Sequence, residues 1–315
     1  MVLILNTISM RTYIAILFIF ISFVSKAQNQ ISPDDFKQIK LYEDTLRMYG
    51  DTLINSQEKD NRTIASYRII KTLTKALKIK NSYYYQWDSL LPWKIVQPED
   101  AAFKIFTWYV RSDEDMYKFF GTIQVKSDTL KMFPLIDYSE FTDHQEDINV
   151  DNNNWIGCLY YGLKTVKSGK KTYYTLFGWD GNNAGSNKKV MEIFSFNKQG
   201  KPRFGAPIIQ MENGKILNRF ILEFSKEASA SLNWNPDEKK IVYDHIAPNG
   251  DALEGFFANY VPDGTYEGFE WKNNRWNWVE KVFTFAIDED DNPPIPVPLF
   301  GEPSRQPQLP NESPK

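Results

Sequence analysis

The stretch "TYYTLFGWDGNNAGSNKKVMEIFSF", residues 172–196, joins two apolar segments through a loop rich in glycine and asparagine. Neighbouring side chains of a strand point to opposite faces. In the first segment one face therefore carries Tyr173, Thr175, Phe177 and Trp179, and the other carries Tyr174 and Leu176. Both faces are apolar, which predicts a strand inside a sheet that is covered on both sides. Because glycine and asparagine tolerate the positive φ values of tight loops, the stretch predicts a β-hairpin.

Short runs of aromatic and aliphatic residues continue on both sides of this hairpin. Eleven of them, from Phe103 to about residue 285, have the length and composition of strands, and turn motifs such as "KSGK", "NKQGK" and "VPDG" separate them. No helix-length segment lies between them, which argues against parallel βαβ units. The sequence therefore predicts a mainly-β fold: an antiparallel, aromatic-rich meander over residues 86–287, arranged as a sandwich or a partly open barrel.

One hairpin can be predicted residue by residue, in "FEWKNNRWNW". A two-residue loop of Asn273 and Asn274 suits a type I′ turn, because asparagine adopts positive φ more readily than most residues. This turn would pair Lys272 with Arg275, and the tryptophans that flank them, Trp271 and Trp276, with each other.

Residues 28–85 predict a helical hairpin. Ser32 and Pro33 form a helix start, with Ser32 as the cap. Apolar residues then recur every three or four positions, which is the spacing of one helical face. The predicted stripes are Phe36, Ile39, Tyr42, Leu46, Tyr49 and Leu53 in the first helix, and Ile64, Tyr67, Ile70, Leu73 and Leu77 in the second. The stripes would cover a sheet or the end of a barrel, or bind a partner as a coiled coil.

The ends of the chain predict export and a flexible tail. The run "YIAILFIFISFV" follows Arg11 and precedes "SKAQ", which is typical of a signal peptide over residues 1–27. At 12 residues it is shorter than the ~20 that cross a membrane, so no transmembrane span is expected after cleavage. Residues 288–315 are acidic and then proline-rich, which predicts a disordered tail. Removing residues 1–27 takes away two of 37 basic residues and none of the 40 acidic ones. The resulting net charge of −5 argues against nucleic acid as a partner.

The loop of the central hairpin was tested against two ligand-binding motifs. Asp180 and Asn182 fit the first positions of a calcium-binding loop, but Ala184 occupies a ligand position and Met191 stands where the final glutamate is required. A phosphate-binding loop fails as well, because no Gly-Lys-Ser/Thr sequence follows. The residues Asp180, Asn182 and Asn183 therefore predict a structural turn, with an irregular ion or ligand site as the alternative.

A second candidate lies in the acidic segment "DYSEFTDHQEDINVDNNN". Asp147, Asn149 and Asp151 have the spacing of calcium ligands in a loop, although Asn152 replaces the glycine that the turn requires. The alternatives are a weak divalent-cation site and a solvated charged loop.

Histidine and cysteine are too few to predict a cofactor or zinc site. The chain has His144 in the acidic segment, His245 in a predicted strand and one cysteine, Cys158. Adjacent strand residues face apart, so Asp244 and His245 cannot form a dyad without a bulge, and His245 is expected to be packed in the core. Cys158 is expected to be a buried apolar residue in a strand. No catalytic residue or cofactor is predicted.

Several blocks resemble an uncharacterised family of exported proteins from the Bacteroidota. They lie within residues 155–285 and include "YYTLFGWDGNN", "GKPRFGAPI", "ILEFSKEASASLNWN" and "YVPDGTYEGFEWKNNRW". The resemblance implies export and no known activity. We expect an envelope or periplasmic protein with a non-catalytic binding or structural role toward a protein or a glycan. The alternative is a carboxylate-based hydrolase acting on glycan, which needs two acids roughly 5–9 Å apart in a cleft.

Overall fold

The structure is a computed structural model that describes residues 31–87, 93–112, 116–250 and 255–283. The signal peptide predicted at residues 1–27 and the tail predicted at residues 288–315 lie outside the described residues. The described residues up to Val282 belong to one compact unit, which contains both the helices and the sheets. None of the described helices has the length and apolar composition needed to cross a membrane.

Two helices precede the sheets, as predicted. The Ser32 hydroxyl accepts a hydrogen bond from the backbone N–H of Asp35 at 3.1 Å, and Pro33 is the first helical residue. This pattern is a helix start that satisfies one of the free N–H groups of the first turn. The first helix buries Ile39, Leu46 and Leu53 of its predicted stripe, whereas Phe36 in its first turn is exposed, contrary to the prediction. The helices are α2 (Pro33–Asn55) and α3 (Lys59–Leu77).

The second helix buries Leu73 and Leu77 of its predicted stripe, but its N-terminal half turns a different face inward from the one predicted. Three of the expected core residues are exposed: Ile64, Tyr67 and Ile70. Two polar residues point inward instead, because the neighbouring sheet offers each a hydrogen-bond partner. Arg62 Nε donates to the Arg111 carbonyl at 2.9 Å, and Trp108 Nε1 donates to Ser66 Oγ at 3.1 Å. These polar contacts, together with the buried Ala65 and Ile69, define the inward face of this half of α3, and apolar periodicity gives no sign of the two polar residues.

In the described residues fifteen strands form three sheets, so the predicted mainly-β fold is confirmed. The first sheet has the order β1-β2-β3-β4, the central sheet β11-β7-β6-β5 with β8 paired to β7, and the third sheet β10-β9-β15-β14-β13-β12. The strands of the first sheet are β1 (Lys94–Val96), β2 (Phe103–Arg111), β3 (Tyr117–Val125) and β4 (Met132–Ile136). Those of the central sheet are β5 (Leu159–Ser168), β6 (Lys171–Asp180), β7 (Ser186–Phe196), β8 (Pro202–Phe204) and β11 (Arg219–Ser225). Those of the third are β9 (Ile209–Gln210), β10 (Ile216–Leu217), β12 (Leu232–Asn235), β13 (Lys240–Pro248), β14 (Tyr260–Lys272) and β15 (Arg275–Val279).

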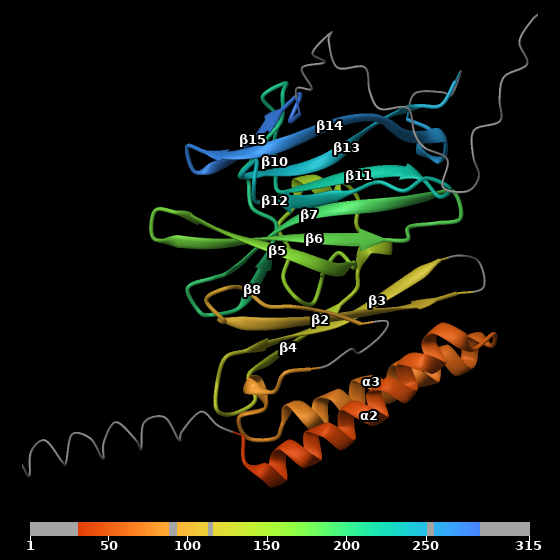
Figure 1. The fold of residues 1–315 in the computed structure, drawn as a ribbon, viewed down its shortest axis with the longest axis vertical. Helices are drawn as coiled ribbons and strands as arrows, with labels where there is room; N and C mark the ends of the chain where they lie inside the picture. The colour runs from red at the N-terminus through yellow and green to blue at the C-terminus, as the bar shows by residue number, and fades with distance from the viewer. Residues whose placement is uncertain (1–30, 88–92, 113–115, 251–254, 284–315) are drawn as a thin grey trace, which may run out of the picture. The chain divides into compact units, whose positions relative to one another are not determined.

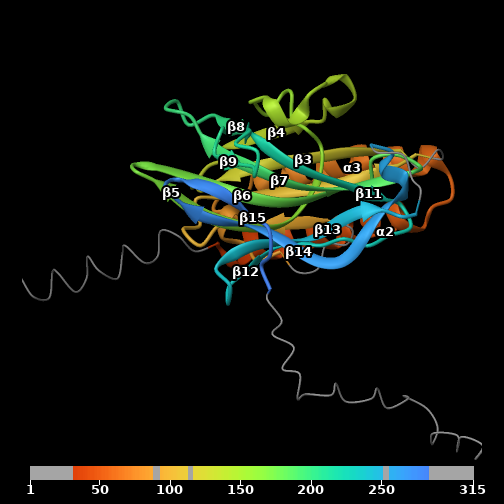
Figure 2. The ribbon, with the colours of Figure 1, turned by 90° about the horizontal axis from the view of Figure 1, so that it is seen from above.

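The helices and sheets stack as four layers in the order helices, first sheet, central sheet, third sheet (Figure 1), and the layers overlap when they are seen from above (Figure 2). Strand β2 shows how the layers join. Its alternate residues Phe106 and Trp108 pack with the helices, while Phe103 and Ile105 pack against the central sheet. Layers of sheet packed face to face match the sandwich alternative of the sequence analysis.

Strand β6 lies inside the central sheet and is covered on both faces, as predicted. Tyr174 and Leu176 belong to the cluster shared with the first sheet, and Phe177 belongs to the cluster shared with the third. Trp179 is the exception, because it packs with the Tyr174 side and its ring lies 5.5 Å from that of Tyr109. A bulge in β5 between Tyr160 and Gly162 opposes this end of β6, and bulges increase the local twist.

The hairpin at Asn273 and Asn274 is confirmed in register. Both asparagines have positive φ, 54° and 62°, and Lys272 pairs with Arg275. The meander is less regular elsewhere, because β9 runs parallel to β15. Without β9, the outer edge of β15 would be free to pair with another chain. The short strand β9 covers this edge by pairing with it.

A buried ion pair joins two strands of the central sheet. Arg219 Nε on β11 lies 2.6 Å from Glu192 Oε2 on β7, and both side chains are almost fully buried. The same arginine also donates to the Gln145 carbonyl. Both charges are removed from water, so each depends on the other for its stability.

We predict that Arg219→Met destabilises the protein by about 3–5 kcal/mol, because it leaves Glu192 buried without its cation. The double variant Glu192→Leu/Arg219→Leu should lose less than the two single variants together, since no charge remains buried. Urea unfolding measures these differences. Asp147→Asn, which breaks the exposed pair with Lys215, is the control and should cost under about 1 kcal/mol. Additive losses in the double variant would show that the two charges are not coupled.

Candidate functional site

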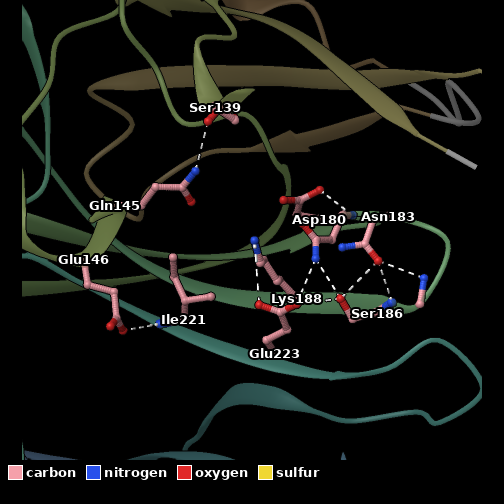
Figure 3. Close-up of polar contacts among 11 residues, drawn as sticks. Ser139, Gln145, Glu146, Asp180, Asn183, Ser186, Lys188, Ile221 and Glu223 are labelled. Atoms are coloured by element: carbon pink, nitrogen blue, oxygen red, sulfur yellow. Dashed lines mark hydrogen bonds and ion pairs between the residues drawn. The ribbon is translucent and has the colours of Figure 1, made fainter. Parts of the chain in front are cut away.

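The loop between β6 and β7 is held by its own side chains. Asp180 Oδ1 accepts a hydrogen bond from the Asn182 backbone N–H at 2.8 Å. Asn183 Oδ1 accepts hydrogen bonds from the backbone N–H groups of Gly185 at 2.8 Å and Ser186 at 3.0 Å (Figure 3). Asn182 has a φ of 45°, in the left-handed region that asparagine tolerates. The structure therefore brings the three predicted residues together as parts of one turn.

A glutamate from another strand completes this loop. Glu223 on β11 accepts hydrogen bonds at Oε1 from Ser186 Oγ at 2.6 Å and Asn182 Nδ2 at 3.0 Å. Its second oxygen, Oε2, lies 3.9 Å from Lys188 Nζ (Figure 3). Sequence analysis missed Glu223, because only the pairing of β11 with β7, which places Glu223 opposite Lys188, reveals the contact.

The carboxyl group of Asp180 is poorly solvated. Burial raises its pKa to about 6, and the carboxylates of Asp137 and Glu223 act in the same direction. The Asn182 N–H and the Lys188 ammonium oppose the shift. Asp180 thus changes charge near neutral pH while it holds the turn.

The three candidate residues of the acidic segment do not share a site. Asp147 forms an ion pair with Lys215 at 3.4 Å, and the Asn149 side chain donates to the carbonyl of Gly205. Asp151 Oδ1 accepts from the backbone N–H of Asn153 at 2.9 Å, within a turn. Each residue contacts a different part of the molecule. Within the described residues, no group of three or more histidine, cysteine, aspartate or glutamate side chains could hold a metal ion.

Two neighbouring residues that sequence analysis did not select hold this segment: Glu146 attaches it to the central sheet, and Gln145 forms a bond within the segment. Glu146 Oε1 accepts a hydrogen bond from the Ile221 backbone N–H on β11 at 3.1 Å, and burial raises the pKa of this carboxyl (Figure 3). Gln145 Nε2 donates to the Ser139 carbonyl at 3.2 Å (Figure 3). β11 is an edge strand of the central sheet, so the acidic segment covers part of an edge that would otherwise be free to pair.

A cleft of about 260 Å³ lies between β4, the turn at residues 151–154 and the β7–β8 turn. We call it the Arg203 cleft. Its lining includes Phe133, Asp151, Asn152, Asn197, Lys201 and Arg203. The volume is slightly below the ~300–1,000 Å³ of ordinary small-molecule sites, and would hold one small ligand or one unit of a longer one.

The lining of the Arg203 cleft carries more positive than negative charge. Within the described part of the chain, the side chains of Lys201 and Arg203 make no hydrogen bond or ion pair. Asp151 is the one carboxylate in the lining, and one of its oxygens is already used in its own turn. Asn197 uses its side-chain oxygen on the N–H groups of its turn, and its amide nitrogen stays available as a donor. The cleft therefore presents cations and amide groups.

His245 is not packed in the core, contrary to the prediction. A bulge in the pairing of β13 with β14 falls between Asp244 and Ile246. The bulge shifts the alternation by one residue, so Ile246 packs against the core and His245 faces solvent. His245 Nδ1 lies 2.7 Å from Asp263 Oδ2, and the side chain is 39% exposed. The neighbouring Asp244 instead accepts from Ser231 Oγ at 2.6 Å, so it forms no dyad with His245.

Cys158 is buried, as expected, although it lies just before β5 rather than inside the strand. Burial raises the pKa of its thiol. Gly178 on β6 makes room for the sulfur, because a Cβ at that position would lie 2.6 Å from Cys158 Sγ. His144, the other histidine, is exposed at the start of a short 3-10 helix and has a φ of 47°. Neither residue belongs to a catalytic arrangement within the described residues.

Comparison with family models, with curated proteins and with solved structures found no match for this chain.

Because folding raises the Asp180 pKa to about 6, this carboxyl binds its proton more tightly in the native state than in the unfolded chain. Its contribution to stability is complete below about pH 4 and is lost as the pH rises through about 6. The substitution Asp180→Asn removes the titrating group and with it the loss of stability at higher pH. It keeps a side-chain oxygen that can accept the hydrogen bond from the Asn182 backbone N–H. We predict that the variant gains about 1–2 kcal/mol over the wild type between pH 4.5 and pH 7.5.

Urea unfolding at several pH values measures this change. The exposed Glu212→Gln serves as the control and should show no comparable trend. A stability difference between Asp180→Asn and the wild type that is constant with pH would contradict the raised pKa.

Proposed function

We propose that the protein is an exported, non-catalytic binding protein of the bacterial envelope, and that it binds an acidic glycan in the Arg203 cleft. The signal-like run before Ala27 and the resemblance to exported Bacteroidota proteins support the location. The observation that supports an acidic ligand is the pair of cations Lys201 and Arg203, whose side chains have no hydrogen-bond or ion-pair partner among the described residues.

The chemistry of the lining supports an anionic ligand. A guanidinium group binds a carboxylate through two parallel hydrogen bonds, and an ammonium group adds a second positive charge. Two cations outnumber the single carboxylate of Asp151 in the cleft. A ligand with a negative charge would therefore be favoured over a neutral one.

The remaining lining residues support a ligand with many hydroxyl groups. Asn197 contributes its side-chain nitrogen as a donor, and Asn152 contributes its side-chain oxygen as an acceptor, because Asn152 Nδ2 already donates to the Pro134 carbonyl at 2.9 Å. The half-buried Phe133 on β4 adds an apolar surface for the C–H groups of a sugar ring. Sugars with a carboxylate, such as uronic acids, combine these features.

The alternative, a glycan hydrolase that works with two carboxylates, has weaker support. Such an enzyme needs two acids roughly 5–9 Å apart on either side of the bond that is cleaved. The lining of the Arg203 cleft supplies Asp151 alone. This favours binding without hydrolysis at this position.

We predict that the protein binds oligogalacturonate and that Arg203→Gln weakens this binding at least about 10-fold, because it removes a charge-assisted pair of hydrogen bonds. Titration calorimetry at low salt measures the affinity. Lys170→Gln, an exposed lysine in the β5–β6 turn, is the matched control and should bind like the wild type.

The fully methyl-esterified oligosaccharide tests the role of charge, because it keeps the hydroxyl groups and loses the carboxylates. It should bind more weakly than the acidic form. Equal binding of both forms, or equal binding by Arg203→Gln and the wild type, would overturn the proposed site. Release of shortened oligosaccharide during the titration would favour the hydrolase.

A further inference from the structure

The helical layer has an outer face that no described residue covers. α2 and α3 lie side by side over the first sheet, and their outer surface faces away from all three sheets (Figures 1 and 2). Four large apolar side chains on this surface are between 47% and 61% exposed: Leu41, Met48, Ile64 and Tyr67. Large exposed apolar groups that cluster on one face indicate an interaction surface.

The same face is strongly basic along α3. Residues 61–81 include six lysines and arginines and no acidic residue, although the whole chain has a net charge of −3. Arg62 is buried against the first sheet, so it does not contribute to the outer surface. Lys71, Lys75 and Lys78 are exposed and form no ion pair within the described residues.

The apolar and basic residues occupy one stripe. Along α3 the positions Ile64, Tyr67, Lys71, Lys75 and Lys78 are separated by three or four residues, which is the spacing of one helical face. On α2 the nearby carboxylates are already engaged. Asp44 pairs with Arg47 at 3.1 Å, Asp51 accepts from the neutral Asn55 at 2.7 Å, and within the described residues neither forms an ion pair with the lysines of α3.

We propose that this helical face binds the surface of an anionic membrane. A helix that carries lysines among exposed apolar residues lies in the lipid headgroup region, where the apolar groups insert and the lysines contact lipid phosphates. Lysine stems are long enough to reach the headgroups while their methylene groups stay in apolar surroundings. The three exposed lysines complement the negative charge of lipid phosphates, which favours an anionic lipid surface as the partner of this face. The Arg203 cleft is formed by strands and turns of the sheets, so both sites could be occupied at once.

Cosedimentation with vesicles tests the proposal. The protein is purified from a host that exports it, and its N-terminus is determined by mass spectrometry. We expect binding to vesicles of phosphatidylcholine with about 30% phosphatidylglycerol, weaker binding to pure phosphatidylcholine, and loss of binding as salt screens the charges.

Two variants separate the contributions of charge and apolar insertion. Lys71→Gln/Lys75→Gln/Lys78→Gln should weaken binding about 100-fold, at about 5-fold for each lysine. Met48→Gln/Tyr67→Gln should weaken it several-fold by removing the inserted groups. Circular dichroism confirms that each variant is folded.

The matched control is Lys126→Gln/Lys167→Gln/Lys170→Gln, which removes three exposed lysines from loops and strand ends of the sheets. It should bind the vesicles like the wild type, and any effect of the N-terminal apolar run is the same in all variants. The proposal is overturned if the wild type does not bind anionic vesicles, or if the α3 triple variant binds as well as the control. It is also overturned if the apolar variant binds like the wild type.

Discussion

Both faces of β6 and β7 are buried, and this constraint determines where the other layers lie. Strands with apolar side chains on two faces need an apolar partner on each side. The first sheet supplies one, through Phe103 and Ile105, and the third sheet supplies the other, through Phe269 and Trp276. The first sheet then has a second apolar face of its own, which the helical hairpin covers. Within this arrangement the buried pair of Glu192 and Arg219 fixes the register of β7 and β11, because neither charge has another way to be neutralised.

Local patterns predicted the features that depend on neighbours in sequence. The turn at Asn273 and Asn274 followed from the φ values that asparagine tolerates, and the two apolar faces of β6 followed from simple alternation. Features that depend on distant residues were not accessible. The inward position of Arg62 and Ser66 on α3 depends on hydrogen bonds to the first sheet, and the position of His245 depends on a bulge. Glu223 reaches the β6–β7 loop only through strand pairing, so no sequence motif could have included it.

Of the two candidate sites, one is formed by neighbours in the sequence and the other by residues that the fold brings together. The loop with Asp180, Asn182 and Asn183 is a turn whose side chains satisfy its own backbone, which leaves little capacity for a ligand. The cleft with Lys201 and Arg203 is the opposite case, because the side chains of these cations have no polar partner in the part of the chain that the structure describes. Sequence analysis selected Asp151 of that cleft for its spacing and missed both cations, which come from the β7–β8 turn and from β8. The proposed binding function therefore rests on residues that only the fold assembles.

Native-state hydrogen exchange tests the central claim, that the doubly covered central sheet is the most stable part of the fold. Amides that exchange only through global unfolding report the most stable elements. The account predicts that the amides of β6 and β7 exchange slowest, with a free energy of opening equal to that of unfolding in urea. Strand β12, at the edge of the third sheet, should exchange faster. Exchange of the β6 amides as fast as that of β12 would contradict the account.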